Sequence, residues 1–113
     1  MHEMAITQSI LRIALDAAEK NGAKRILAIH LRLGDFSDVM PAYVRSYFDI
    51  ASAGTIACGA KITETRTPAT VRCRDCGAKS VIEKRSIRCP RCQSANLELL
   101  SGTEFTVESV EIE

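Results

Sequence analysis

The chain has 113 residues, of which 46% are apolar and 26% are charged, and its formal net charge at pH 7 is +1. This length and composition fit one ordinary domain or two very small ones, and they exclude an intrinsically disordered chain. No apolar run approaches the roughly 18 residues that a membrane-spanning helix needs, and the start of the chain lacks the pattern of a secretory signal. We therefore expect a cytoplasmic protein with no membrane segment.

Residues 4–20 are predicted to form an amphipathic helix that ends at Asn21-Gly22. Its expected buried stripe follows the helical period and holds Ile6, Ile10, Ile13 and Ala17. Residues 25–33 alternate between two kinds of side chain, which predicts a strand with one strongly buried face. That face is expected to hold Leu27, Ile29, Leu31 and Leu33. His30 falls on the opposite, less apolar face, and we interpret it as structural.

A second helix is expected to begin at Pro41 and to end before Gly54, because proline suits the first helical turn. Its apolar side would hold Val44, Tyr47, Phe48 and Ala51. Residues 60–66 predict a polar edge strand, and residues 104–113 predict a last strand. The fold class that follows is α+β, with two helices on a small three-stranded sheet and an inserted zinc-ribbon-like module. The helix–sheet domain would comprise residues 1–68 and 101–113, and the inserted module residues 69–100.

The inserted module carries a four-cysteine pattern, Cys73-x2-Cys76-x12-Cys89-x2-Cys92. Two CxxC turns joined by a short hairpin can direct four thiolates to one tetrahedral centre, which is the geometry of a zinc site with sulfur ligands. The module offers few residues for a core, namely Val71, Val81, Ile82 and Ile87. Because that is too little for unaided folding, metal binding would also supply folding free energy.

Four protein ligands leave no open coordination position, so we expect the metal to be structural and the chain to have no catalytic residue. A redox dithiol and an iron–sulfur centre remain weaker alternatives, because paired CxxC turns at this spacing favour zinc. The fifth cysteine, Cys58, lies in an Ala-Cys-Gly turn, where we expect a small, partly buried thiol without a ligand role.

The charges are distributed unevenly along the chain. Residues 71–92 hold seven basic and two acidic side chains, whereas residues 93–113 hold five acids and no base. A basic block could contact phosphates, so a nucleic-acid-binding zinc ribbon or an adaptor module is the alternative function. Residues 69–103 contain no aromatic side chain, however, and therefore lack the stacking platform of single-strand binders. We expect no nucleic-acid partner.

His2 offers a second candidate metal site at the start of the chain. A histidine next to a free N-terminus places an imidazole and an α-amine within one chelate, with an amide nitrogen between them. Nitrogen donors from successive residues can lie in a plane, which suits Ni(II) or Cu(II). By chemistry alone this signal is weak.

Several segments occur here in one order: Met1-His2-Glu3-Met4, Thr7-Gln8-Ser9, Gly54-Thr55-Ile56-Ala57, the two CxxC pairs, Glu98-Leu99-Leu100-Ser101-Gly102 and Val110-Glu111-Ile112-Glu113. Together they closely resemble the HypA/HybF family of nickel chaperones for the maturation of nickel–iron hydrogenases. The resemblance covers essentially the whole chain, and its most specific parts are the two ends and the cysteine module.

The resemblance implies a nickel-binding α+β domain interrupted by a zinc domain. It implies Ni(II) bound by the Met1 amine, by His2 and by the backbone nitrogens of His2 and Glu3, and Zn(II) bound by Cys73, Cys76, Cys89 and Cys92. The implied activity is delivery of nickel, together with the GTPase HypB, to the hydrogenase large subunit. A homodimer is left open. Some members also serve urease and carry histidines beside their cysteine pairs, where this chain has Gly77-Ala78 and Gln93.

Overall fold

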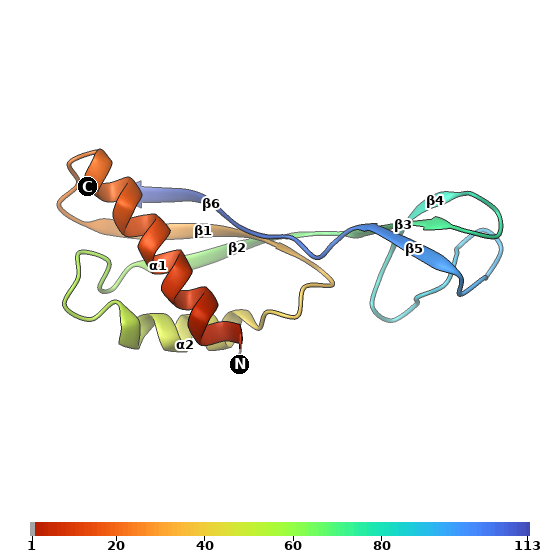
Figure 1. Ribbon diagram of the computed structural model, residues 1–113, viewed down its shortest axis with the longest axis horizontal. Coiled ribbons are helices and arrows are strands. Elements are labelled where there is room, and N and C mark those ends of the chain that lie inside the picture. The colour runs from red at the N-terminus through yellow and green to blue at the C-terminus, as the bar shows by residue number, and fades with distance from the viewer. Residues whose placement is uncertain (1) are drawn as a thin grey trace. The chain divides into compact units, whose positions relative to one another are not determined.

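The computed structural model describes the backbone of residues 2–113 and the side chains from Glu3 onward. In chain order (Figure 1), its elements are α1 (His2–Lys20), β1 (Ile26–Gly34), α2 (Pro41–Ala51), β2 (Lys61–Thr67), β3 (Ala69–Cys73), β4 (Lys79–Ile82), β5 (Leu97–Ser101) and β6 (Phe105–Ile112). Two three-stranded sheets result, with the strand orders β2-β1-β6 and β4-β3-β5. The α+β fold class predicted from the sequence is confirmed, with the second sheet lying in the chain between β2 and β6.

The chain forms two compact units. The first unit comprises Met1–Leu31, Val39–Glu64 and Val107–Glu113, and the second unit comprises Arg32–Asp38 and Thr65–Thr106. The first unit therefore contains both helices and both ends of the chain, whereas the second contains all four cysteines of the paired motif. Neither helix in the described part of the chain carries an apolar stretch long enough to span a bilayer.

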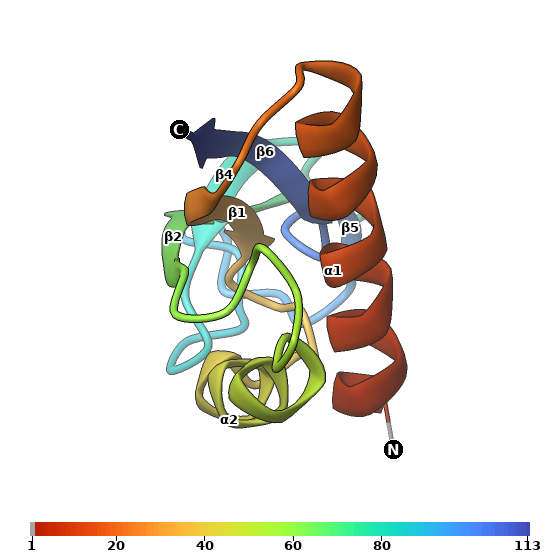
Figure 2. The same cartoon turned by 90° about the vertical axis from the view of Figure 1, so that its left-hand side faces the viewer.

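In the first unit, α1 and α2 lie on the same side of the sheet (Figure 2). Strands β1 and β2 run in the same direction and β6 runs against them (Figure 1), so α2 is the crossover that parallel neighbours require. Pro41 opens α2, as expected from its preset backbone angle. Strand β6 is held beside β1 at its end, where the N–H of Lys24 donates to the carbonyl of Glu113 at 2.8 Å.

The buried face of α1 differs from the predicted one. Ile10 is buried as expected, but Ile13 is 50% exposed, and Ala14 and Ala18 are fully buried instead. Small side chains at these two positions allow close packing of the helix, and α1 packs against α2. In β1, Leu27 is 43% exposed, so that prediction was also wrong, while the other three predicted leucine and isoleucine positions of the strand are buried.

The second unit contains a small sheet with a small core. Strand β3 is central and pairs antiparallel with both β4 and β5. Its buried cluster consists of Ala69, Val71 and Ile82, with Phe36 and Leu97 packed against it. Val81 and Ile87, which were predicted for this core, are more than half exposed. Phe36 was not predicted here, because it lies far from the cysteine module in the sequence.

Two glycines permit a close backbone approach in the second unit. A Cβ atom built on Gly34 would lie 2.2 Å from the carbonyl carbon of Gly102, and one built on Gly102 would lie 2.6 Å from the Cα of Ala69. No side chain fits at such distances, so these positions require glycine. The segments around residues 34, 69 and 102 are thereby packed backbone against backbone.

Candidate metal centre

The four cysteines of the paired motif converge on one point in the second unit. Their sulfur atoms all lie within 4.8 Å of one another. The Sγ atoms of Cys73 and Cys92 are 3.5 Å apart, and those of Cys76 and Cys89 are 3.6 Å apart. These separations are far longer than the roughly 2.05 Å of a disulfide bond, so the arrangement is a cluster of free thiols.

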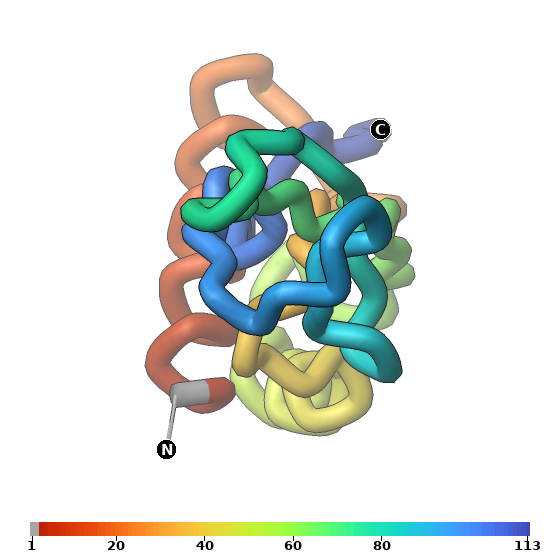
Figure 3. The backbone as a smooth tube through the Cα atoms, turned by 90° about the vertical axis from the view of Figure 1, so that its right-hand side faces the viewer, coloured from red at the N-terminus to blue at the C-terminus, as the bar shows by residue number. Residues whose placement is uncertain are grey.

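The cluster is built by two turns that make the same set of hydrogen bonds. Figure 3 shows the course of the backbone that carries them. In the first turn, the N–H of Cys76 donates to the sulfur of Cys73 at 3.4 Å, and in the second the N–H of Cys92 donates to the sulfur of Cys89 at 3.4 Å. Each turn then closes with a backbone bond of 2.8 Å, from Gly77 N–H to the Cys73 carbonyl and from Gln93 N–H to the Cys89 carbonyl.

The residue that follows each cysteine pair has a left-handed backbone. Gly77 has φ 77°, and glycine adopts this conformation without steric cost, so a glycine after the first cysteine pair is consistent with such a turn. Gln93 has φ 65° at the equivalent position of the second turn. Sequence reasoning missed this position, since glutamine gives no local signal for a left-handed turn. Only the repeat of the CxxC motif, which places Gln93 where the first turn has Gly77, could have indicated it.

The surroundings of the sulfur atoms lower the pKa values of Cys73 and Cys89 and raise those of Cys76 and Cys92. The backbone N–H of Cys76 lowers the pKa of Cys73, and the backbone N–H of Cys92 lowers the pKa of Cys89 to about 7. For Cys92, the N–H of Ser94 acts to lower the pKa, but the sulfur of Cys73 and the loss of water outweigh it and raise the pKa to about 12. Four negative thiolates at this spacing repel one another, and a divalent cation would relieve that repulsion.

The geometry of the cluster fits a tetrahedral metal. With zinc–sulfur bonds of about 2.3 Å, a regular tetrahedron has sulfur–sulfur edges of about 3.8 Å. The two measured pairs, at 3.5 and 3.6 Å, lie close to this value, and the remaining pairs stay within 4.8 Å. The donor set of four sulfurs is the one that structural zinc prefers. The residues present therefore fit the zinc-ribbon-like module expected from the sequence.

Two of the three residues predicted to bind nickel, His2 and Glu3, lie at the start of α1. Met1 and the side chain of His2 are outside the described residues. The backbone of His2 opens α1, and Glu3 lies in its first turn. Glu3 is 8% exposed and its carbonyl accepts a hydrogen bond from the hydroxyl of Thr7. An acid in the first turn also interacts favourably with the helix dipole.

Two further sequence predictions concern Cys58 and His30. Cys58 is exposed, so the expectation of a partly buried thiol was wrong: it lies in the irregular turns after α2, where little covers it. It is not a member of the four-cysteine cluster. His30 is bound through Nδ1 to the hydroxyl of Thr63 at 2.6 Å, and its Nε2 lies 3.7 Å from a carboxylate oxygen of Glu108. It thus connects β1 to both neighbouring strands.

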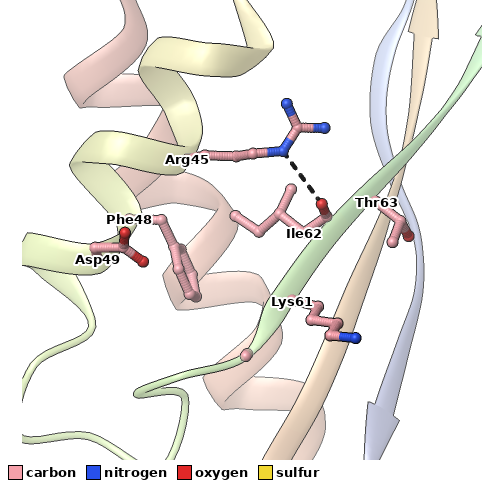
Figure 4. A pocket seen from close by; sticks show the side chains of 7 residues that line it. Arg45, Phe48, Asp49, Lys61, Ile62 and Thr63 are labelled. Carbon is pink, nitrogen blue, oxygen red and sulfur yellow. Dashed lines mark hydrogen bonds between the residues drawn. The ribbon is translucent and has the colours of Figure 1, made fainter.

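A depression of about 310 Å³ lies in the first unit between α2 and β2 (Figure 4). Phe48 is on its wall, and Arg45 reaches across to the strand, where its Nε donates to the carbonyl of Ile62 at 3.4 Å. The same guanidinium forms an ion pair with Glu64 at 2.7 Å. Because β2 is an edge strand of this sheet, Arg45 covers part of an edge that could otherwise pair with another chain.

These features define a small α+β protein with a four-cysteine cluster in a zinc-ribbon-like module. The sequence pattern of the family described as "Hydrogenase/urease nickel incorporation, metallochaperone, hypA" matches residues 1–112. The chain belongs to this family of nickel-incorporation metallochaperones, whose members act in hydrogenase maturation.

Individual relatives match over nearly their whole length. The hydrogenase maturation factor HypA of Dehalococcoides mccartyi is 38% identical over 113 residues, which are 100% of this chain and 95% of the relative. That of Chloroflexus aurantiacus is 38% identical over 112 residues, with 98% of each chain covered. The solution structure of the nickel metallochaperone HypA from Helicobacter pylori matches with a TM-score of 0.65 and 20% identity, covering 97% of this chain and 96% of that one. At 20% identity, this similarity shows a shared fold and nothing further.

Proposed function

We propose that this protein carries Ni(II) at its N-terminus and delivers it for the maturation of a nickel–iron hydrogenase. The observation that carries the proposal is membership of the metallochaperone family over residues 1–112, a match that includes the Met1-His2-Glu3 segment. The proposed ligands are the Met1 amine, the His2 imidazole and the backbone nitrogens of His2 and Glu3. We assign nickel binding to residues 1–68 and 101–113, and zinc binding to residues 69–100.

The helical start of the chain supports this ligand set on physical grounds. The first N–H groups of an α-helix have no acceptor within the helix, so the amides of His2 and Glu3 are not held in intrahelical bonds. A chelate ring that includes two successive backbone nitrogens needs ψ of about 0°, and helical ψ is about −42°, much nearer than extended ψ of about +135°. Nickel binding would therefore need only a local adjustment of the first turn.

We also propose that Cys73, Cys76, Cys89 and Cys92 hold Zn(II) as a structural ion. The support is the near-tetrahedral spacing of the four sulfur atoms. With all four positions taken by the protein, the zinc would organise the second unit without taking part in a reaction. The protein would thus act as a carrier, with no enzymatic activity of its own.

The proposed carrier cycle depends on exchange of ligands. A planar site at the end of the chain has donors that can leave one at a time, which favours transfer of nickel to another protein. The amine and imidazole must be deprotonated to bind, so nickel affinity should fall as the pH falls. The proposed partners are the GTPase HypB and the hydrogenase large subunit in the cytoplasm, and a homodimer remains an open alternative to a monomer.

A nickel titration on protein with its native N-terminus tests the proposal. Calorimetry and absorbance should show Ni(II) binding with the yellow colour of a planar site, and a copy with one extra residue before Met1 should not bind. His2→Ala should also lose binding, whereas the control His30→Ala should keep it, because His30 is tied into the sheet. Equal binding by the native and extended proteins would place the nickel site elsewhere and refute the N-terminal chelate.

One observation favours the alternative of an adaptor or nucleic-acid-binding ribbon. All seven basic side chains of residues 71–92 are exposed: Arg72, Arg74, Lys79, Lys84, Arg85, Arg88 and Arg91. A gel shift that weakens steeply with rising salt would support this function, because phosphate contacts release counterions. An unshifted nucleic acid at moderate salt, combined with N-terminal nickel binding, would exclude it.

A further inference from the structure

Asp75 lies inside the first cysteine turn, between Cys73 and Cys76, and its carboxylate reaches the segment that follows the second turn. Its Oδ2 accepts a hydrogen bond from the hydroxyl of Ser94. Its Oδ1 accepts a second, longer bond from the side-chain amide of Asn96 at 3.5 Å. We name Asp75, Ser94 and Asn96 the carboxylate bridge.

Further hydrogen bonds hold two of these residues, Ser94 and Asn96, in place. The N–H of Asn96 donates to the hydroxyl oxygen of Ser94 at 3.0 Å, so this hydroxyl is both donor and acceptor. The carbonyl of Ser94 accepts from the N–H of Cys89 at 2.8 Å, and the carbonyl of Asn96 accepts from the N–H of Arg74 at 2.9 Å. The bridge is therefore bonded to the backbone of both cysteine turns.

The carboxylate bridge lies next to the two exposed cysteines of the cluster in the sequence. Cys73 and Cys89 are each 1% exposed, whereas Cys76 and Cys92 are exposed. Asp75 directly precedes Cys76, and Ser94 follows Cys92 by two residues. The bridge thus ties together the two segments that carry the exposed sulfurs, from which a competing ligand would begin to remove a metal.

We propose that Asp75 is a positioning residue of the metal site, and that the carboxylate bridge keeps Cys76 and Cys92 in ligand position and sets the rate at which the metal leaves. This inference rests on the zinc site proposed above. Groups that hydrogen-bond around metal ligands typically change metal affinity by about 10- to 100-fold when they are removed. Here the bridge acts by joining the two turns, so its loss should show mainly as faster release.

The test measures zinc transfer from the full-length, zinc-loaded protein to an excess of a chromogenic chelator under reducing conditions. Asp75→Ala should release zinc about 10-fold faster than the wild type or more. Asp75→Asn should be intermediate, because it keeps one acceptor oxygen. Ser94→Ala should also accelerate release, and the double variant should accelerate it by less than the product of the two single effects, because both variants remove the bond between Asp75 and Ser94.

Two controls separate positioning from general loosening of the fold. Glu83→Ala removes an exposed carboxylate of the same unit that lies outside the bridge and should release zinc at the wild-type rate. Replacement of zinc by Co(II) gives absorption bands that report thiolate geometry, and these should shift in Asp75→Ala and remain unchanged in Glu83→Ala.

The outcomes distinguish this inference from the proposed zinc site. A wild type that purifies without zinc and takes none up would overturn both. A wild type with one zinc ion per chain, from which Asp75→Ala and Ser94→Ala release zinc at the wild-type rate, would overturn the role of the bridge alone. Equal acceleration by Glu83→Ala would also overturn it, because the effect would then not depend on Asp75.

Discussion

Removing zinc from the cysteine cluster should unfold the second unit while the first unit stays folded. The buried cluster of the second unit contains only two large aliphatic side chains, Val71 and Ile82, which are 2% and 4% exposed. Burial of each stabilises the fold by about 1.5–3 kcal/mol, or about 3–6 kcal/mol for the pair. A structural zinc ion contributes about 10–16 kcal/mol at pH 7. Zinc binding should therefore stabilise the second unit more than the burial of this pair does.

The first unit has a core that needs no metal. Its fully buried side chains include Ile10, Ile26, Ile29, Val44 and Phe48. Upon addition of a chelator stronger than the site, in the presence of reductant, we expect the amide signals of β3, β4 and β5 to lose their dispersion in a ¹⁵N correlation spectrum. The signals of α1 and α2 should remain at their folded positions.

A core variant provides the matched comparison. Ile82→Ala in the zinc-loaded protein should cost about 2–5 kcal/mol, less than the loss of zinc, so that the second unit stays folded and unfolds at a lower denaturant concentration. If the zinc-free wild type instead keeps the dispersion and hydrogen-exchange protection of β3–β5, its small core is sufficient for folding. That result would refute the reasoning, because the metal would then not be required.

Three further predictions address single positions. Phe48→Ala should destabilise the first unit by about 3–5 kcal/mol in denaturant unfolding, with unchanged Co(II) spectra at the cysteine cluster. Both Gly77 and Gln93 have positive φ, which glycine adopts without the steric cost of a Cβ atom, so Gly77→Ala should destabilise the second unit by about 1–2 kcal/mol and Gln93→Gly should stabilise it. A change of stability with the same sign in both variants would contradict this. The hydroxyl of Thr67 and a backbone N–H lower the pKa of Glu104 from 4.5. The ionised carboxylate therefore stabilises the fold above about pH 4.5, and this stabilisation is lost as the pH falls through the pKa of the folded state. Glu104→Gln should be less stable than the wild type at pH 7, and the difference should disappear in acid. Thermal melts at several pH values measure this.

The sequence by itself determined both helices, the three strands of the first sheet and the order in which they and the cysteine turns occur. Alternation in residues 25–33, the helical period after Met4 and Pro41, and the paired cysteines are local patterns, and each produced the expected helix, strand or turn. The cysteine spacing alone indicated a cluster, because four ligands on two short turns have few other ways to be satisfied. The side of its element on which an apolar residue lies was not always predicted correctly, as the exposed Ile13 and Leu27 demonstrate.

Tertiary structure alone decided which segments that are distant in the sequence contact one another. Phe36 joins the core of the second unit because the end of β1 is packed there, and no periodicity within its own segment indicates this. Gln93 adopts a left-handed backbone because the second turn must match the first around the same sulfurs, which overrides its own preference. Asp75 reaches Ser94 across 19 residues for the same reason. Local patterns specify which elements form, whereas these contacts depend on where the elements meet, and that is a property of the folded chain.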